Sequence, residues 1–120
     1  ELDTQVWFDR AGRRPGQVSP GRRGQVREMM REVLAAGSLD LTEESLVERP
    51  AVDRLGEIRV PTLIITGDQD DPSVLAAGEL LASGILNADK LVIPGGAHLI
   101  NMEKPEEFNR AVLGFPRGRA

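Results

Sequence analysis

The chain has 120 residues, of which 40% are hydrophobic and 28% charged, and its formal net charge is −4. This balance is typical of a single folded globular domain, and it excludes the disordered and fibrous classes of protein. The absence of cysteine excludes disulfides, zinc–thiolate sites and thiol nucleophiles together, and it makes a cytoplasmic location the simplest expectation.

The N-terminal stretch begins at Glu1 without an initiator methionine and enters an apolar cluster around Trp7. It shows no signal peptide, and even the longer apolar runs, such as Thr62 to Thr66, are far too short to cross a bilayer. We therefore expect a chain that continues from a longer polypeptide and does not contact a membrane.

An arginine-rich stretch follows. Between Arg10 and Arg31 there are seven arginines and a single acid, Glu28. Such a run could bind phosphate, but no aromatic residues interleave it to stack on bases. The pattern favours a solvated face, and we expect no nucleic-acid partner.

The first predicted helix lies behind a loop. Residues 12–24 hold four glycines and two prolines and show no apolar periodicity, which indicates a loop. From Val26 the apolar residues recur at the spacing of an amphipathic helix that ends at Gly37 as a left-handed cap. The apolar positions are Val26, Met29, Met30, Val33 and Leu34. Asp40 then begins a second short helix, which Pro50 ends.

After Arg59 the pattern changes to a strand followed by a helix. The segment VPTLIITG is apolar at consecutive positions up to Gly67, which is typical of a strand buried on both faces of a parallel sheet. Asp71 is a predicted N-cap, with Pro72 at the first position of a helix that runs to about Ser83.

The same order repeats to the end of the chain. KLVIPG, from Lys90, predicts a second buried strand, and Pro105 begins a final helix with apolar residues on one face. That face carries Phe108, Ala111, Val112 and Phe115. Alternating strands and helices predict an α/β fold with a parallel sheet. Because two strands alone make a poor sheet, we expect an upstream segment or a partner to supply further strands.

Polar residues follow both predicted strands. GDQDD, with Asp68, Asp70 and Asp71, follows the first strand, and PGGAH delivers His98, the only histidine of the chain, after the second. The carboxyl ends of neighbouring parallel strands meet at one edge of the sheet, where ligands bind. A carboxylate beside an imidazole fixes its tautomer and stabilises the imidazolium. A lone histidine behind a glycine turn can equally be an ordinary loop residue.

A calcium-binding loop is the alternative interpretation of the aspartate cluster. Asp68, Asp70 and Glu79 fall at positions one, three and twelve of that pattern. Pro72, however, stands at the fifth position, where a ligand belongs, and the sixth lacks the required glycine. We therefore expect no metal.

Together, VPTLIITGDQDDPSV and LVIPGGAHLINMEKPEEFNRAVLGF resemble the C-terminal end of the α/β-hydrolase superfamily, over Pro50 to Phe115. In that family a strand with the pattern Pro-Thr-Leu-x-x-x-Gly-x-x-Asp carries the triad acid, and a glycine turn after the last strand carries the triad histidine. The resemblance implies that Asp70 is the catalytic acid and His98 the catalytic base. Their order also fits the family's Ser, Asp, His.

The resemblance also implies a domain organisation. Residues 1–50 would be the end of a helical cap and the helix that follows it. Residues 51–116 would be the C-terminal strand–helix–strand–helix part of the hydrolase core, containing the last two parallel strands of its sheet, and residues 117–120 a tail.

The nucleophile of that family is missing. It sits in Gly-x-Ser-x-Gly, and none of the serines here has those glycines; an oxyanion loop is also absent. The implied function is hydrolysis of an ester, lactone or similar acyl bond by a complete enzyme that needs no cofactor. Removing the nucleophile of such a unit lowers the rate by about a millionfold, so we expect no turnover by this chain alone. The alternative is a non-catalytic fragment that self-associates or binds a partner.

Overall fold

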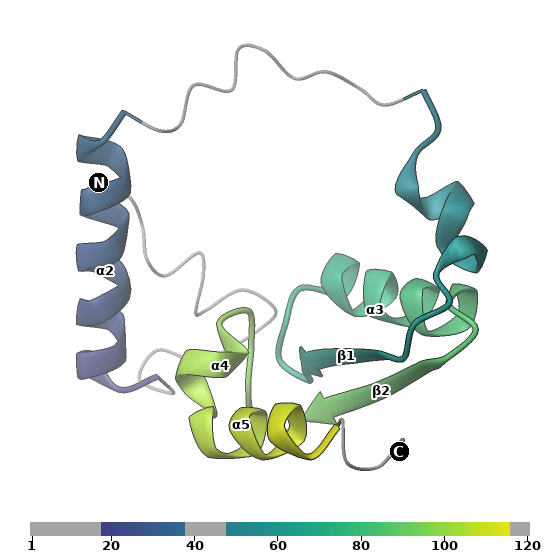
Figure 1. Cartoon of the computed structure of the whole chain (residues 1–120). Coiled ribbons are helices and arrows are strands. Elements are labelled where there is room, and N and C mark those ends of the chain that lie inside the picture. The colour runs from purple at the N-terminus through teal and green to yellow at the C-terminus, as the bar shows by residue number, and fades with distance from the viewer. Residues whose placement is uncertain (1–17, 38–47, 116–120) are drawn as a thin grey trace.

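The structure is a computed structural model that describes residues 18–37 and 48–115 of the chain (Figure 1). The elements are α2 (Pro20–Ala35), the 3₁₀ helix η2 (Ala51–Glu57), β1 (Thr62–Gly67), α3 (Pro72–Gly84), β2 (Ala88–Ile93), α4 (Ile100–Glu103) and α5 (Pro105–Gly114). The predicted helix beginning at Asp40 falls almost entirely outside the described residues, and residues 48–50 at its expected end are not helical.

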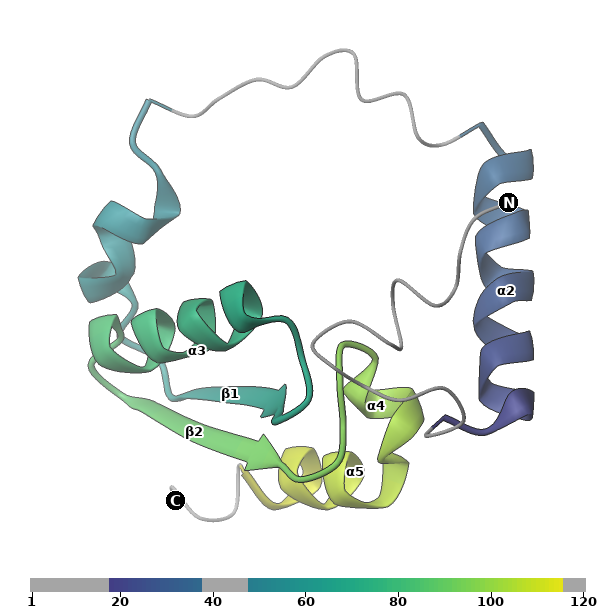
Figure 2. The same ribbon diagram turned by 180° about the vertical axis from the view of Figure 1, so that it is seen from behind.

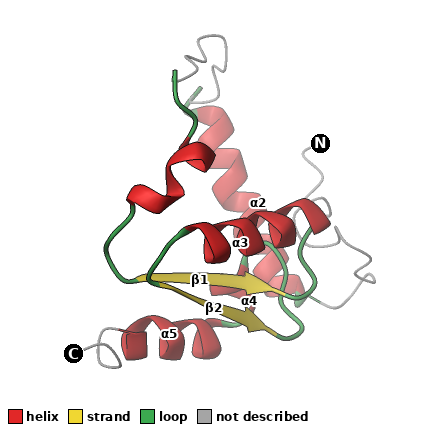
Figure 3. Ribbon diagram, turned by 90° about the vertical axis from the view of Figure 1, so that its right-hand side faces the viewer, coloured by secondary structure: helices red, strands yellow, loops and turns green. Residues whose placement is uncertain are grey.

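The two strands form a parallel pair, as predicted. Their register runs from Thr62 opposite Ala88 to Gly67 opposite Ile93. Helix α3 connects them and lies on one face of the pair, while α5 lies on the opposite face (Figure 3). This arrangement of helix, sheet and helix confirms the α/β fold class.

Burial of the strands differs from the expectation. Ile64 and Thr66 of β1 are buried against α3, where a Cβ added at Gly78 would meet both side chains. In β2, by contrast, Leu91 and Val92 are 37% and 41% exposed. The prediction of a second strand buried on both faces is therefore wrong for the described residues. Within them both strands pair on one side only, so the difference lies in what covers their faces: Leu63 and Ile65 of β1 line a groove with α5, and no residue of β2 does.

Helix α2 begins earlier than predicted. Residues 20–24 are helical, so the interpretation of a loop up to Gly24 is wrong there. The side-chain oxygen of Ser19 accepts a hydrogen bond from the backbone N–H of Arg22 at 3.4 Å, and Pro20 occupies the first turn. This N-cap signal outweighs the low helix propensity of the two glycines that follow. Gly37 has a φ of +66°, which confirms the left-handed cap.

The contact of α2 with the rest of the fold is small. Val18 and Val26 are buried, and the partly buried side chains of Met30, Leu99 and Met102 pack against them. Figure 2 shows α2 beside the turn that includes α4. The remaining apolar positions of the predicted stripe are 38–52% exposed. Among the helices of residues 18–37 and 48–115, none combines the length and apolar character that a bilayer span requires.

Helix η2 had no specific signal in the sequence. It places Leu55 against the end of α3, where a Cβ added at Gly84 would lie 2.7 Å from the Cδ1 atom of Leu55. Leu55 is buried as a result. This contact attaches the segment before β1 to the strand–helix–strand unit.

The substitution Gly84→Ala tests this contact. We expect it to lower the free energy of unfolding by about 1–3 kcal/mol, because the added methyl group overlaps the Leu55 side chain. Urea denaturation of the chain measures the change. Gly56→Ala, where a Cβ would meet nothing within 4 Å, is the matched control. Combining Gly84→Ala with Leu55→Ala should cost less than the sum of the two single changes; strict additivity would contradict the contact.

Candidate active site

The two loops of interest leave the sheet at the same edge. β1 ends at Gly67 and β2 ends at Ile93, and these two residues are partners in the register. The loop of residues 68–71 and the loop of residues 94–98 therefore begin side by side, at the carboxyl ends of parallel strands. This is the arrangement that the sequence predicted.

The backbones of the two loops touch. A Cβ added at Gly67 would lie 2.2 Å from the carbonyl oxygen of Gly96, a distance at which no side chain fits. The backbone N–H of Gln69 donates to the same carbonyl oxygen at 2.9 Å. Gly95 has a φ of +72°, which a glycine adopts without strain. The glycines thus serve close approach at Gly67 and a tight turn at Gly95.

Asp70 and His98 meet across these loops. Nδ1 of His98 lies 3.1 Å from Oδ1 and 3.3 Å from Oδ2 of Asp70. The Asp70 side chain is 6% exposed, whereas that of His98 is 39% exposed. The backbone N–H of Asp71 donates to Oδ1 of Asp70 at 2.7 Å, which holds the carboxylate in place. The structure therefore brings together the two residues that the sequence singled out.

This geometry fixes the chemistry of the ring. An ionised carboxylate only accepts hydrogen bonds, so a hydrogen bond between the two side chains in that state requires the hydrogen on Nδ1 of His98. In the neutral ring, Nε2 is then the basic nitrogen. Because the partly exposed imidazole is backed by a buried carboxylate, Asp70 can stabilise the positive charge that develops when Nε2 takes a proton. The pair is suited to general acid–base catalysis.

The three aspartates of GDQDD each make a different contact. Asp70 contacts the imidazole. Asp71 caps α3, because its Oδ1 accepts from the backbone N–H of Ser73 at 2.9 Å. Asp68 accepts from the backbone N–H of Gly95 at 2.7 Å and so ties the two loops together. Sequence reasoning identified the first two and missed the third, because the contact depends on the pairing of the strands.

Glu103 is a further residue that sequence reasoning missed. It ends the single-turn helix α4, and its Oε2 accepts from the backbone N–H of Ala97 at 3.1 Å. A one-turn helix is too short to show apolar periodicity, so the sequence did not predict α4 or the position of Glu103.

The described residues do not form the cluster of ligands that a calcium loop would need. Glu79, its twelfth position, pairs with Lys90 across α3 and β2. Among residues 18–37 and 48–115, no three histidine or acidic side chains lie close enough together to hold a metal ion.

Comparison with known proteins finds partial similarity to several larger enzymes. No family model matches the chain. RutD of Rhizobium rhizogenes is 45% identical over 69 residues, which are 57% of this chain and 26% of that protein. The 3-oxoadipate enol-lactonase 2 of Acinetobacter baylyi is 35% identical over 69 residues, 58% of this chain and 26% of that protein. The chain thus spans about a quarter of the length of these curated relatives.

A comparison with solved structures gives the same similarity. The crystal structure of a bromoperoxidase from Bacillus anthracis is 30% identical and superposes with a TM-score of 0.74 over 95% of this chain and 41% of that one. In both sequence and fold, the chain resembles the C-terminal portion of α/β-hydrolase superfamily proteins.

The substitution Gly67→Ala tests the contact on which the site depends. The added methyl group would overlap the backbone of Gly96, which cannot move aside like a flexible side chain. We expect the free energy of unfolding to fall by about 3 kcal/mol, at the upper end for overpacking. Urea denaturation measures this, with Gly114→Ala, which meets nothing within 4 Å, as control. Equal stability of the two variants would show that the loops do not touch.

Proposed function

We propose that this chain supplies the acid and the base of a Ser-Asp-His triad in an α/β hydrolase that cleaves an ester, lactone or similar acyl bond. The observation that carries the proposal is the contact of buried Asp70 with Nδ1 of His98 at the carboxyl ends of β1 and β2. The position of these residues in the sequence pattern of the superfamily supports the same assignment.

The reaction would proceed in two stages. Nε2 of His98 takes the proton of a serine hydroxyl as its oxygen bonds to the acyl carbon, and then gives that proton to the departing alcohol oxygen. In the second stage Nε2 takes a proton from water, whose oxygen bonds to the acyl carbon, and returns it to the serine. Asp70 keeps the ring oriented and stabilises the imidazolium throughout.

The nucleophile would come from a segment other than these 120 residues, because no serine here is flanked by the glycines of its motif. The lactone class of substrate rests on the similarity to the enol-lactonase of Acinetobacter baylyi. Its name describes ring opening at an acyl–oxygen bond, which is the chemistry that a serine, histidine and aspartate perform together.

A chimera tests the assignment of both residues. This chain replaces the matching C-terminal segment of the enol-lactonase, and lactone hydrolysis is followed. We expect turnover by the chimera, a loss of about a millionfold in kcat with His98→Ala, and a loss of about 10⁴-fold with Asp70→Asn. The 120-residue chain assayed alone should show no turnover.

Asp71→Asn is the matched control for Asp70→Asn. Asparagine caps a helix as well as aspartate does, so this variant should keep the rate of the unmodified chimera. Full activity with His98→Ala would refute the role of the histidine. Equal losses from the changes at Asp70 and Asp71 would refute the choice of acid.

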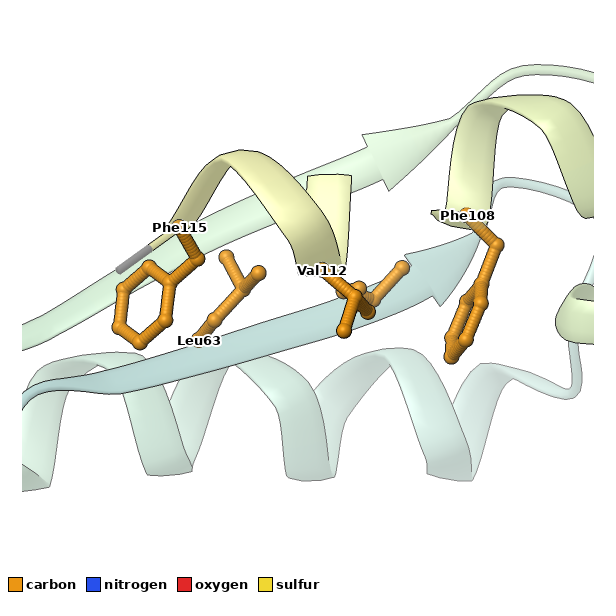
Figure 4. A pocket seen from close by; sticks show the side chains of 5 residues that line it. Leu63, Phe108, Val112 and Phe115 are labelled. Carbon is orange, nitrogen blue, oxygen red and sulfur yellow. The ribbon is translucent and has the colours of Figure 1, made fainter. Parts of the chain in front are cut away.

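A second candidate function is self-association, which an apolar groove favours. The groove, of about 450 Å³, lies between β1 and α5 and is lined by Leu63, Ile65, Phe108, Val112 and Phe115. Figure 4 shows the side chains of Phe108 and Val112 of α5, and of Phe115 just after it, on the side of the helix that faces the strand carrying Leu63. Within the described residues, only β2 pairs with β1, so one edge of β1 has no strand beside it. We propose that a second copy of the chain covers this groove when no other segment does.

Native mass spectrometry of the purified chain tests this association, since it gives the number of copies directly. We expect a defined oligomer, which Val112→Asp converts into a monomer by placing a charge in the groove. Leu113→Asp is the control: Leu113 follows Val112 on α5, is 72% exposed and does not line the groove. A monomeric unmodified chain, or an equal effect of both substitutions, would exclude association through the groove.

A further inference from the structure

We propose that Glu103 is a positioning residue for His98, and that it acts by holding the peptide unit between Gly96 and Ala97. The catalytic meaning of this role rests on the function proposed above for His98. The structural role can be tested separately, because it concerns the orientation of the imidazole in the chain itself.

The peptide unit of Gly96 and Ala97 is held at both ends. Its carbonyl oxygen accepts from the backbone N–H of Gln69 at 2.9 Å, and its N–H donates to Oε2 of Glu103 at 3.1 Å. In a trans peptide these two groups point in opposite directions. Two hydrogen bonds on opposite sides therefore restrain the peptide unit more strongly than either bond does alone.

This peptide unit links the two catalytic side chains. Gln69 directly precedes Asp70, and Ala97 directly precedes His98. Holding the plane thus sets the distance between the acid loop and the base loop at the point where their side chains meet. The restraint is needed because Gly95 and Gly96 precede it, and glycine adopts many backbone conformations at low cost.

The N–H of Ala97 has little access to water. Ala97 is 2% exposed, and Gly96 is also buried. A buried N–H without an acceptor is costly, and a hydrogen bond to a carboxylate is stronger than one to a neutral acceptor. Glu103 therefore satisfies a donor that bulk water does not reach.

Helix α4 delivers the Glu103 carboxylate to this point. The backbone N–H of Glu103 donates to the carbonyl oxygen of Leu99 at 2.9 Å, which closes the turn directly after His98. Ile100 is buried beneath the glycine turn, and a Cβ added at Gly96 would lie 2.0 Å from its Cδ1 atom. Helix α4 thus packs against the loop of residues 94–98, and Glu103, its last residue, holds that loop through the N–H of Ala97.

Nuclear magnetic resonance of the 120-residue chain tests the proposal. His98 is the only histidine, so every imidazole signal belongs to it. Long-range ¹H–¹⁵N spectra distinguish a ring protonated at Nδ1 from one protonated at Nε2. We expect the Nδ1–H tautomer in the unmodified chain and its loss in Glu103→Ala. Glu103→Gln keeps an acceptor oxygen at the same reach and should retain it.

The matched control is Glu106→Ala, which removes an exposed carboxylate from the first turn of α5 and should leave the Nδ1–H tautomer unchanged. A folded Glu103→Ala variant that keeps this tautomer would overturn the proposal. If Glu103→Ala does not fold, Glu103→Met, which keeps the length and lacks an oxygen, takes its place. Unfolding of both variants would also overturn it, because Glu103 would then serve folding rather than positioning.

The chimera with the enol-lactonase separates the two proposals. If Glu103 positions His98 for catalysis, Glu103→Ala should lower kcat with little change in KM, and Glu103→Gln should restore much of the loss. A chimera without activity, combined with the expected tautomer change, would refute the proposed hydrolase function and leave the positioning role intact. An active chimera in which Glu103→Ala changes neither kcat nor the tautomer would refute the positioning role alone.

Discussion

The backbone contact between the ends of β1 and β2 is the constraint on which the candidate site depends. Gly67 approaches the carbonyl of Gly96 so closely that a side chain at position 67 would force one of the two backbones to shift. Parallel pairing in the observed register creates this approach, since it places Gly67 opposite Ile93. The contact between Asp70 and His98 is a consequence, because both side chains emerge within three to five residues of these strand ends.

Around this contact two carboxylates hold the glycine-containing loop of residues 94–98. Asp68 ties the start of the base loop to the acid loop, and Glu103 holds the peptide just before His98. Each uses charge-assisted hydrogen bonding to a backbone N–H, which is stronger than bonding to a neutral acceptor. Asp70 meanwhile contacts the imidazole of His98 and accepts from the backbone N–H of Asp71. A loop flexible enough to turn sharply is thereby made rigid enough to aim a side chain.

The elements that the sequence predicted well are those with strong local signals. The strand ending at Gly67 and the helix capped by Asp71 were placed almost to the residue, because a bounded apolar run and an Asp-Pro start are recognisable without tertiary information. The start of α2 was misplaced because the glycines around Gly24 obscured the Ser19 cap. The one-turn helix α4 was missed because four residues carry no period.

The sequence by itself determined the α/β order of elements and, through the motifs around Asp70 and His98, the pair of residues that meet. It did so because each motif is a local pattern of strand, turn and polar residue. Only the tertiary structure showed that Asp68 ties the two loops together by accepting from the backbone N–H of Gly95. It also revealed the role of Glu103, and it showed that Leu91 and Val92 of β2 are partly exposed, although the sequence predicted a buried strand. These outcomes depend on which backbone atoms lie opposite one another once the strands pair. A pattern of residues along the chain does not contain the distances between atoms of different segments.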